Sequence, residues 1–415
     1  MIFRSFGGTG CPRLRGTGFA LPSALPILTP LAGFERGVAA CREALSAGLS
    51  AAARAWKERH PGALTLGCFP VYSPLELFHA AGVMPFGLLG AGASVEITHA
   101  DSRFQSFVCS IAKSSLELGL QGRLEGVDGA VFHSICDVAR NLASVFRRNF
   151  PDRFVEFIHF PQNMTSPAGQ AYTVSEYRRV LGNLVRWTGR EVPDGALSES
   201  IRLYNRIRGR IRDLYALRRR HPERITAAEI YLLVRGGTLM DPVGFLALLE
   251  EALPEAQART SKARDAVRVV IEGAFCEQPP VDLLEVIERA GCYVVDDDLL
   301  IGWRWFDGDV PETGDPLEAL ASSYLNRSVY SSVRHDPRRP RSEELIRRVR
   351  DAGADAVLFC PAKFCEPALL DYVLHRQALD RESIPHLTVE FEEKMWTFDR
   401  VRNEVETFVE SILFE

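Results

Sequence analysis

Cysteine is the residue type in this sequence that could support redox or metal chemistry. The chain of 415 residues contains nine cysteines. An odd number in a large chain argues against a disulfide framework and leaves buried thiols, metal ligands or redox centres as alternatives. Cys109, Cys136 and Cys365 are far apart in the sequence. Thiolates from separate segments suit an iron–sulfur cluster better than zinc, whose structural sites usually use close Cys-x-x-Cys pairs that this sequence lacks.

The predicted positions of these cysteines favour metal binding. Cys136 directly follows an apolar run (residues 129–135, GAVFHSI), which we interpret as a buried strand, and it opens a predicted helix. Cys365 follows another predicted strand and comes just before Pro367, which suits the first turn of a helix. Cys109 is expected on or at the start of a helix. Ligands of open α/β sheets bind beyond the carboxyl ends of the strands, and a helix N-terminus stabilises a thiolate.

A purely structural role remains an alternative for every cysteine, because free cysteine is among the most buried residue types. We interpret Cys41, Cys276 and Cys292 as core residues. Cys68 and Cys360 could be spare ligands, although the core is the favoured location for both. A cluster held by three cysteines would leave one iron open for a small ligand or a substrate oxygen.

Alternating strand and helix patterns determine the predicted fold class. We expect an α/β protein with two parallel-sheet, flavodoxin-like α/β domains and a helical N-terminal and middle section. The expected parts are a disordered extension (1–33), an N-terminal helix (34–60), a first α/β domain (61–195), a helical connector (196–262) and a second α/β domain (263–415). The predicted strands are 129–135, 154–160, 266–272, 292–296, 354–360 and 386–390, and residues 64–72 form a short apolar segment at the start of the first α/β region.

Composition excludes several function classes. A formal net charge of −5 and a pI near 6.1 give no basic surface for nucleic acid or acidic membranes. No apolar stretch is long enough to span a bilayer, so we expect a cytoplasmic protein that does not bind a membrane. The sequence has no Gly-x-x-x-x-Gly-Lys-[Ser/Thr] loop, and we expect that the chain itself binds no ATP.

Several motifs, in order along the chain, resemble those of the 2-hydroxyacyl-CoA dehydratase/benzoyl-CoA reductase family. The resemblance covers about residue 64 to the C-terminus, and its pieces are specific because they occur together. They are Pro74-Leu-Glu-Leu-Phe-His-Ala-Ala-Gly-Val-Met-Pro85, Cys109-Ser-x-x-Lys113, Asp128-Gly-x-Val-Phe-His-Ser-Ile-Cys-Asp137, Tyr204-Asn-x-x-Arg208, Asp296-Asp297-x-x-x-x-Gly302-x-Arg304, Asp315-Pro-Leu-Glu-Ala-Leu-Ala321, Phe364-Cys365-Glu-Pro367 and Ile384-Pro-x-Leu-x-x-Glu390.

The resemblance implies a [4Fe–4S] cluster held by Cys109, Cys136 and Cys365 in an oxygen-sensitive cytoplasmic enzyme complex. It also implies a homologous sister subunit, ATP-hydrolysing iron–sulfur activator subunits and an acyl-CoA substrate. Cys360 lies outside the motif, yet it leaves the identity of the third ligand open. Ser110, Lys113, His133 and Asp137 could tune such a cluster by hydrogen bonding, or could be ordinary structural groups. His133, Glu76 and Glu390 are ionisable groups near the motifs, for which a structural role is favoured over a catalytic one.

Three functions are compatible with the resemblance. The segments HSICDVARNL and FCEPALLDYVLHRQALD are more similar to benzoyl-CoA reductase subunits, which pass electrons into the aromatic ring of an acyl-CoA thioester. A dehydratase, in which one electron makes a ketyl radical that loses the hydroxyl group, is the alternative. The chain could also be an electron-relay subunit whose sister subunit binds the acyl-CoA.

Overall fold

The computed structural model describes residues 33–392 and 394–414. The extension predicted for residues 1–33 lies outside this part except for Gly33, where the first helix, α1 (Gly33–Arg59), begins. None of the helices in the described ranges is both long enough and apolar enough to cross a membrane.

Two four-stranded parallel sheets form the framework, which confirms the predicted fold class. The first sheet has the order β2-β1-β3-β4 and the second the order β6-β5-β7-β8, so both repeat the strand order 2-1-3-4 of flavodoxin-like sheets. The strands of the first sheet are β1 (Leu64–Cys68), β2 (Val83–Gly87), β3 (Gly129–His133) and β4 (Phe154–Ile158). The strands of the second are β5 (Val267–Glu272), β6 (Cys292–Asp297), β7 (Ala356–Phe359) and β8 (His386–Thr388).

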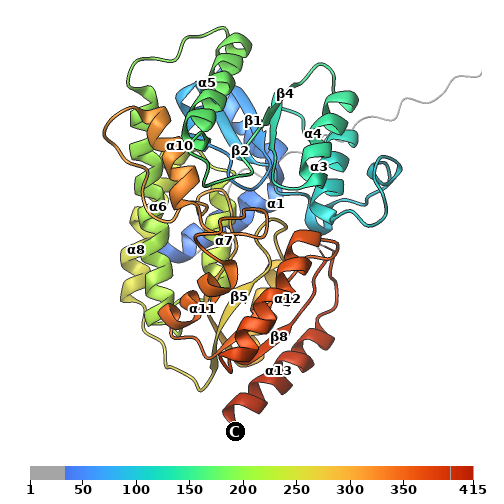
Figure 1. Cartoon of the computed structure of the whole chain (residues 1–415), viewed down its shortest axis with the longest axis vertical. Helices are drawn as coiled ribbons and strands as arrows, with labels where there is room; N and C mark the ends of the chain where they lie inside the picture. The colour runs from blue at the N-terminus through green and yellow to red at the C-terminus, as the bar shows by residue number, and fades with distance from the viewer. Residues whose placement is uncertain (1–32, 393, 415) are drawn as a thin grey trace, which may run out of the picture. The chain divides into compact units, whose positions relative to one another are not determined.

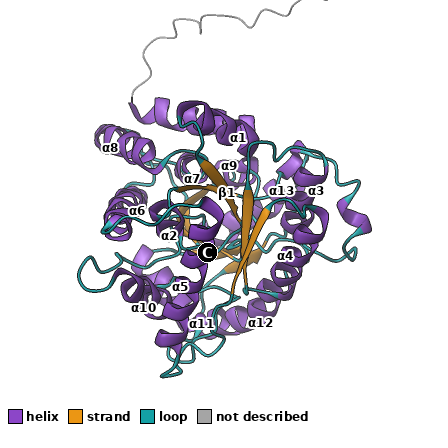
Figure 2. Cartoon of the chain, turned by 90° about the horizontal axis from the view of Figure 1, so that it is seen from above, coloured by secondary structure: helices purple, strands orange, loops and turns teal. Residues whose placement is uncertain are grey.

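Helices surround the strands, as the view from above shows (Figure 2). Around the first sheet, α3 and α4 pack together on one side, while α2 and α5 contact β2 and β4. Around the second, α11 packs with α12, and α9 packs with α13. The bounds are α2 (Leu75–Ala80), α3 (Ser110–Leu120), α4 (Asp137–Asn149), α5 (Gly169–Thr188), α9 (Val281–Arg289), α10 (Pro316–Arg327), α11 (Arg341–Ala352), α12 (Glu366–Arg381) and α13 (Asp399–Leu413), with two short 3₁₀ turns at Gly92–Ser94 and Ala100–Ser102.

The helical middle section packs with the N-terminal helix (Figure 1). It consists of α6 (Ala196–Arg220), α7 (Ala227–Gly237) and α8 (Pro242–Ala258), and α1 packs against α7 and α8. A side chain at Gly236 would collide with the Cβ atom of Cys41, so this glycine permits the close approach of α7 to α1. The predicted single helix at the N-terminus contains a kink at Gly48, whose φ is 81°.

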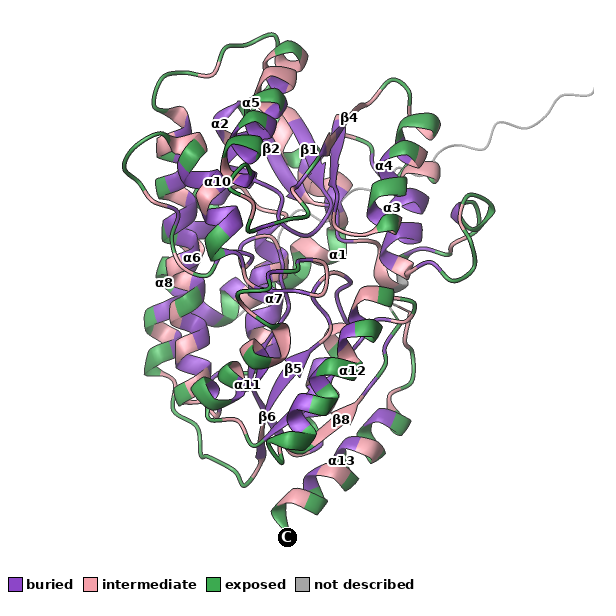
Figure 3. Ribbon diagram, in the orientation of Figure 1, coloured by how far each residue is buried: buried purple, intermediate pink, exposed green. Residues whose placement is uncertain are grey.

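Burial explains why most strands were predictable, and a proline explains why one was not. Strands β3, β6 and β7 are buried along their whole length, as expected for parallel strands covered on both faces. The buried strand β6 is labelled in Figure 3. Strand β2 was missed because Pro85 lies within it, and proline is normally excluded from the middle of a sheet. The proline is tolerated because β2 is an edge strand of the first sheet.

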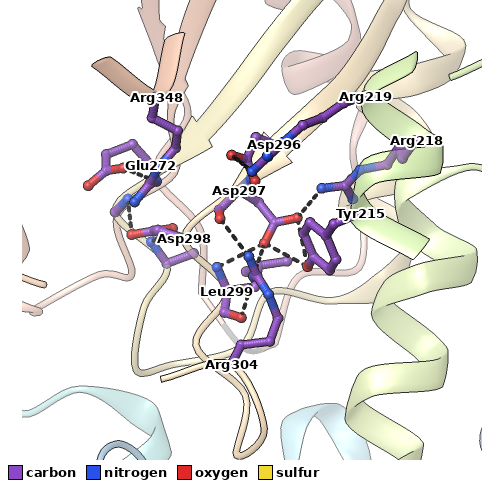
Figure 4. Close-up of polar contacts among 12 residues, drawn as sticks. Tyr215, Arg218, Arg219, Glu272, Asp296, Asp297, Asp298, Leu299, Arg304 and Arg348 are labelled. Carbon is purple, nitrogen blue, oxygen red and sulfur yellow. Dashed lines mark hydrogen bonds and ion pairs between the residues drawn. The ribbon is translucent and has the colours of Figure 1, made fainter. Parts of the chain in front are cut away.

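A buried charge network joins the end of β6 to α6 and explains one of the sequence motifs (Figure 4). The Asp297 carboxylate accepts hydrogen bonds from Arg218 at 2.7 Å, Arg304 at 2.6 Å and Tyr215 at 3.0 Å. Burial alone would raise the pKa of Asp297, but the two guanidinium groups lower it to about 2. Removing one partner of such a buried pair typically costs about 3–5 kcal/mol. The motif Asp296-Asp297…Arg304 therefore joins the end of β6 and the segment after it to α6.

Two further motifs meet in a second buried pair. Glu76 on α2 accepts a hydrogen bond from Arg208 on α6 at 2.5 Å, and both side chains are almost fully buried. The Asn205 side chain also holds the segment around Val310. It donates a hydrogen bond to the Val310 carbonyl at 2.8 Å and accepts one from the Val310 amide at 2.9 Å. The favoured structural interpretation of Glu76 agrees with this pairing.

One buried carboxyl group makes the stability of the fold depend on pH. Glu288 on α9 accepts a hydrogen bond from the Ala227 amide at the start of α7, and burial raises its pKa to about 7. Its unfolded pKa is about 4.3, so folding favours the protonated form, and the favourable contribution is lost as the pH rises through the folded pKa.

We predict that Glu288→Gln stabilises the protein increasingly as the pH rises, because glutamine keeps the acceptor and never ionises. The free energy of unfolding of the variant minus that of the wild type should grow by roughly 2 kcal/mol between about pH 5 and pH 8. Urea denaturation at several pH values measures this difference. Glu343→Gln, at an exposed position on α11, is the control. A difference that does not change with pH would contradict the prediction.

Candidate functional site

A cavity of about 660 Å³ receives loops from both sheets and contains the three predicted ligands. Cys109, Cys136 and Cys365 all line it, although they belong to segments far apart in the sequence. A fourth thiol, that of Cys276, lines the same cavity. The structure therefore brings together the three cysteines selected from the sequence and adds one that the sequence analysis assigned to the core.

Exposure separates the cysteines into two groups of four within the described part of the chain. The four that line the cavity are partly exposed, whereas Cys41, Cys68, Cys292 and Cys360 are buried. The side chain of Cys360, at the end of β7, is only 1% exposed and does not line the cavity. Cys365, five residues later, does line it. The geometry therefore favours Cys365 over Cys360 as a ligand.

Three of the cavity cysteines are N-cap residues of helices. Cys109 precedes α3, Cys136 precedes α4 and Cys365 precedes α12. The Cys136 sulfur accepts a hydrogen bond from the Ala139 amide at 3.5 Å. Each helix N-terminus places a partial positive charge near its thiol, and this favours a negatively charged group in the cavity.

In the metal-free protein, burial outweighs the helix termini and favours the protonated thiols. Burial raises the pKa of Cys365 to about 12, and also raises that of Cys136. Burial, followed by the neighbouring Glu277, Cys365 and Cys136, raises the pKa of Cys109 well above its usual value. The four thiols are thus close enough to influence one another, and all four could be thiolates together only with a cationic partner.

The thiols that meet at the cavity are the donor type that iron–sulfur clusters use. Over residues 33–392 and 394–414, no three His, Cys, Asp or Glu side chains are arranged to hold one metal ion. A four-iron cluster is larger than one ion, so its thiolates lie further apart, around a cavity. Thiolates are also the usual protein ligands of such clusters.

The other groups singled out near the motifs have identifiable structural contacts. His133 is fully buried in β3, and its Nε2 atom lies 2.9 Å from the Phe69 carbonyl and 3.1 Å from the Ser73 hydroxyl. Burial lowers the pKa of His133 to about 4, so the ring is neutral. Lys113 forms an ion pair with Asp101 at 2.9 Å. Neither residue lines the cavity, whereas Asp137 does and is exposed.

Glu277 connects the two halves of the site. Its carboxylate accepts hydrogen bonds from the Ser110 hydroxyl and, at 3.3 Å, from the Ile111 amide in the first turn of α3. The loop after β5 is thereby attached to the helix that follows Cys109. Glu277 was not among the residues predicted from the sequence, although its position shortly after a predicted strand followed by Gly273 was a usable signal. Glu390, which sequence analysis did select, is exposed and does not line the cavity.

A family model and several known proteins are similar to this chain over most of its length. The family model described as 2-hydroxyglutaryl-CoA dehydratase, D-component, matches residues 70–412. The chain is 36% identical to one of the benzoyl-CoA reductase subunits of Thauera aromatica over 87% of this chain and 94% of that protein. It is 30% identical to the (R)-2-hydroxyglutaryl-CoA dehydratase subunit beta of Acidaminococcus fermentans over 86% of this chain and 94% of that protein. It is also 27% identical to the (R)-phenyllactyl-CoA dehydratase beta subunit of Clostridium sporogenes over 85% of this chain and 92% of that protein.

The exposure of the cysteines predicts an order of alkylation in the folded, iron-free protein. Cys109, Cys136, Cys276 and Cys365 should react with iodoacetamide before Cys41, Cys68, Cys292 and Cys360, since only the first four are reached from the cavity. Peptide mass spectrometry over a time course measures the order. The denatured protein, in which all of these thiols are accessible, is the control. Labelling of Cys360 as fast as Cys365 in the folded protein would contradict the arrangement described above.

Proposed function

The chain belongs to the 2-hydroxyglutaryl-CoA dehydratase D-component family, and from this membership we propose that it is the [4Fe–4S]-holding subunit of a benzoyl-CoA reductase-type enzyme. In such an enzyme, ATP-driven single-electron transfer would reduce an aromatic acyl-CoA thioester. The observation that carries the proposal is the meeting of Cys109, Cys136 and Cys365 around one cavity at three helix N-termini.

The residues of this chain would bind the cluster, orient it and limit its contact with water. Cys109, Cys136 and Cys365 would hold the cluster as thiolates, while the N-termini of α3, α4 and α12 would offset its negative charge. The cluster would supply electrons one at a time at low potential. Phe275 and Ile135 line the cavity and would lower the local dielectric, which disfavours extra negative charge and keeps the potential low.

The dehydratase function remains the alternative, and one observation favours it. The family model and two of the relatives described above carry dehydratase names, and the identity to the beta subunit of Acidaminococcus fermentans reaches 30%. The 36% identity to the reductase subunit over a similar span favours the reductase. Product analysis of the assembled complex distinguishes the two, since ring reduction adds electrons to the acyl group and dehydration removes water.

We also propose three partners for this chain. These are a homologous sister subunit, an ATP-hydrolysing iron–sulfur activator and the acyl-CoA substrate, all in the cytoplasm. The eight described cysteines are free thiols, as expected in a reducing compartment. The relatives from Thauera aromatica and Acidaminococcus fermentans are both named as subunits and are therefore parts of larger assemblies.

An exposed apolar surface beside the cavity is suited to the sister subunit. Phe107, Phe364 and Leu370 line the cavity and are 59%, 41% and 73% exposed. Leu369, Val373 and Leu374 continue the surface along α12, and we call these six residues the apolar rim. Large apolar patches of this kind are typical of permanent interfaces, whereas transient interfaces such as that of an activator are more polar.

The cluster assignment is tested by removing the proposed ligands one at a time. Cys109→Ala, Cys136→Ala and Cys365→Ala, prepared anaerobically together with the neighbouring gene products, should each lose most of the about four irons and four sulfides expected per chain. Cys360→Ala, at a buried cysteine outside the cavity, should retain them. Iron and acid-labile sulfide analysis with low-temperature EPR provides the measurement. A folded wild-type complex without iron would refute the proposal.

The interface assignment is tested by placing charge on the apolar rim. We expect the double variant Leu370→Glu/Leu374→Glu to weaken binding of the sister subunit by roughly tenfold or more, because two carboxylates would be buried without partners. Val243→Glu, at an apolar residue on α8 that is 62% exposed, is the matched control. Analytical ultracentrifugation measures the assembly. Undiminished assembly combined with lost activation would assign the apolar rim to the activator instead.

A further inference from the structure

Cys276 shares its location with the proposed ligands and not with the core cysteines. It is partly exposed and lines the same cavity as Cys109, Cys136 and Cys365. Its sulfur lies 4.0 Å from the carbonyl oxygen of Pro70, in the segment that follows β1. The Cys276 thiol is thus located where the loops after β1 and β5 meet, between the two sheets.

The strand order explains why a ligand is expected at this position. In sheets of order 2-1-3-4, ligands bind at the carboxyl ends of the two strands where the direction of the chain order reverses. These strands are β5 and β7 in the second sheet. Cys276 follows β5 and Cys365 follows β7, so the two thiols come from the two strands that flank this reversal.

The loop that carries Cys276 is anchored at both ends. Gly273, which has φ of 103°, makes the turn directly after β5, and its amide donates to the Asp298 carboxyl group at 2.7 Å. The Tyr231 hydroxyl donates to the Pro279 carbonyl at 2.6 Å. Between them, Glu277 accepts hydrogen bonds from the first turn of α3. A thiol on such a loop is held in position before any metal binds, as a ligand requires.

We propose that Cys276 is the fourth thiolate ligand of the cluster in this chain. This inference rests on the proposed function. On binding iron, the Cys276 thiol loses its proton to solvent and the sulfur donates an electron pair to the fourth iron, with no change of oxidation state. With four cysteine ligands, no iron of this cluster is open to a substrate oxygen. The chain then acts as an electron relay, and the acyl-CoA reacts on the sister subunit.

The experiment asks whether the cluster has an open iron. The wild-type complex, Cys276→Ala and the control Cys360→Ala are prepared anaerobically and reduced, and ¹³C-labelled cyanide is added. Pulsed EPR then detects magnetic coupling between the cluster and a bound ¹³C nucleus. The chain is assembled with sister subunits in which the cysteines that align with Cys109, Cys136 and Cys365 are replaced by alanine, so that only the cluster of this chain contributes.

We expect no ¹³C coupling in the wild type or in Cys360→Ala, because four thiolates exclude cyanide. Cys276→Ala should show the coupling, and mild oxidation should convert it to a three-iron cluster, since an iron without a thiolate is released most easily. Cyanide coupling in the wild type would overturn the assignment of Cys276 and leave the proposed cluster intact. A wild-type chain without iron would overturn the cluster as well. Because the wild-type measurement decides the question, the test holds even where the variant fails to fold.

Discussion

The direction of parallel strands is the constraint on which the candidate site depends. Every strand of a parallel sheet has its carboxyl end at the same edge, so the loops that follow these strands are necessarily neighbours. Here β3 is followed by Cys136, β5 by Cys276 and β7 by Cys365, and all three loops reach one cavity. Strand direction thus makes the loops after β5 and β7 neighbours within the second sheet. The loop after β3 joins them because the first sheet also directs it to the same cavity.

A conflict between burial and charge governs the chemistry of this cavity. The helix N-termini at Cys109, Cys136 and Cys365 favour negative charge, yet burial favours neutral thiols in the metal-free protein. Only a cationic group can satisfy both, and iron in a cluster is such a group. Binding of the proposed cluster would therefore be coupled to proton release, because the cavity is an unfavourable place for thiolates without a cationic group.

The sequence was sufficient to predict most of the framework because local patterns decide it. Apolar runs such as residues 129–135 predict strands that are buried on both faces, and the fold class followed from their alternation with helices. Strand β2 was not predictable in this way, since Pro85 contradicts the usual strand pattern and is tolerated only at an edge that the tertiary structure creates.

The candidate site was predictable only in part. Cys136 and Cys365 adjoin helix starts, a local signal, whereas Cys276 lies in a loop four residues after β5 and was assigned to the core. Cys276 also follows the carboxyl end of a strand. The local sequence does not reveal, however, which residues of this loop face the first sheet and the cavity. Conversely, the motif pairs Glu76–Arg208 and Asp297–Arg304 carry strong family resemblance, and the structure gives them packing roles.

The path of the chain between Cys109 and Cys365 has a consequence for how the molecule is held together. These cysteines lie on opposite sides of the whole helical middle section in the sequence, yet they line one cavity. A group bonded to both Cys109 and Cys365 would be a cross-link that closes a very long loop. Such a cross-link removes much conformational freedom from the unfolded chain. The same group would join two half-molecules, neither of which has the complete set of thiols. The group that carries the electron would then also cross-link the two halves of the chain.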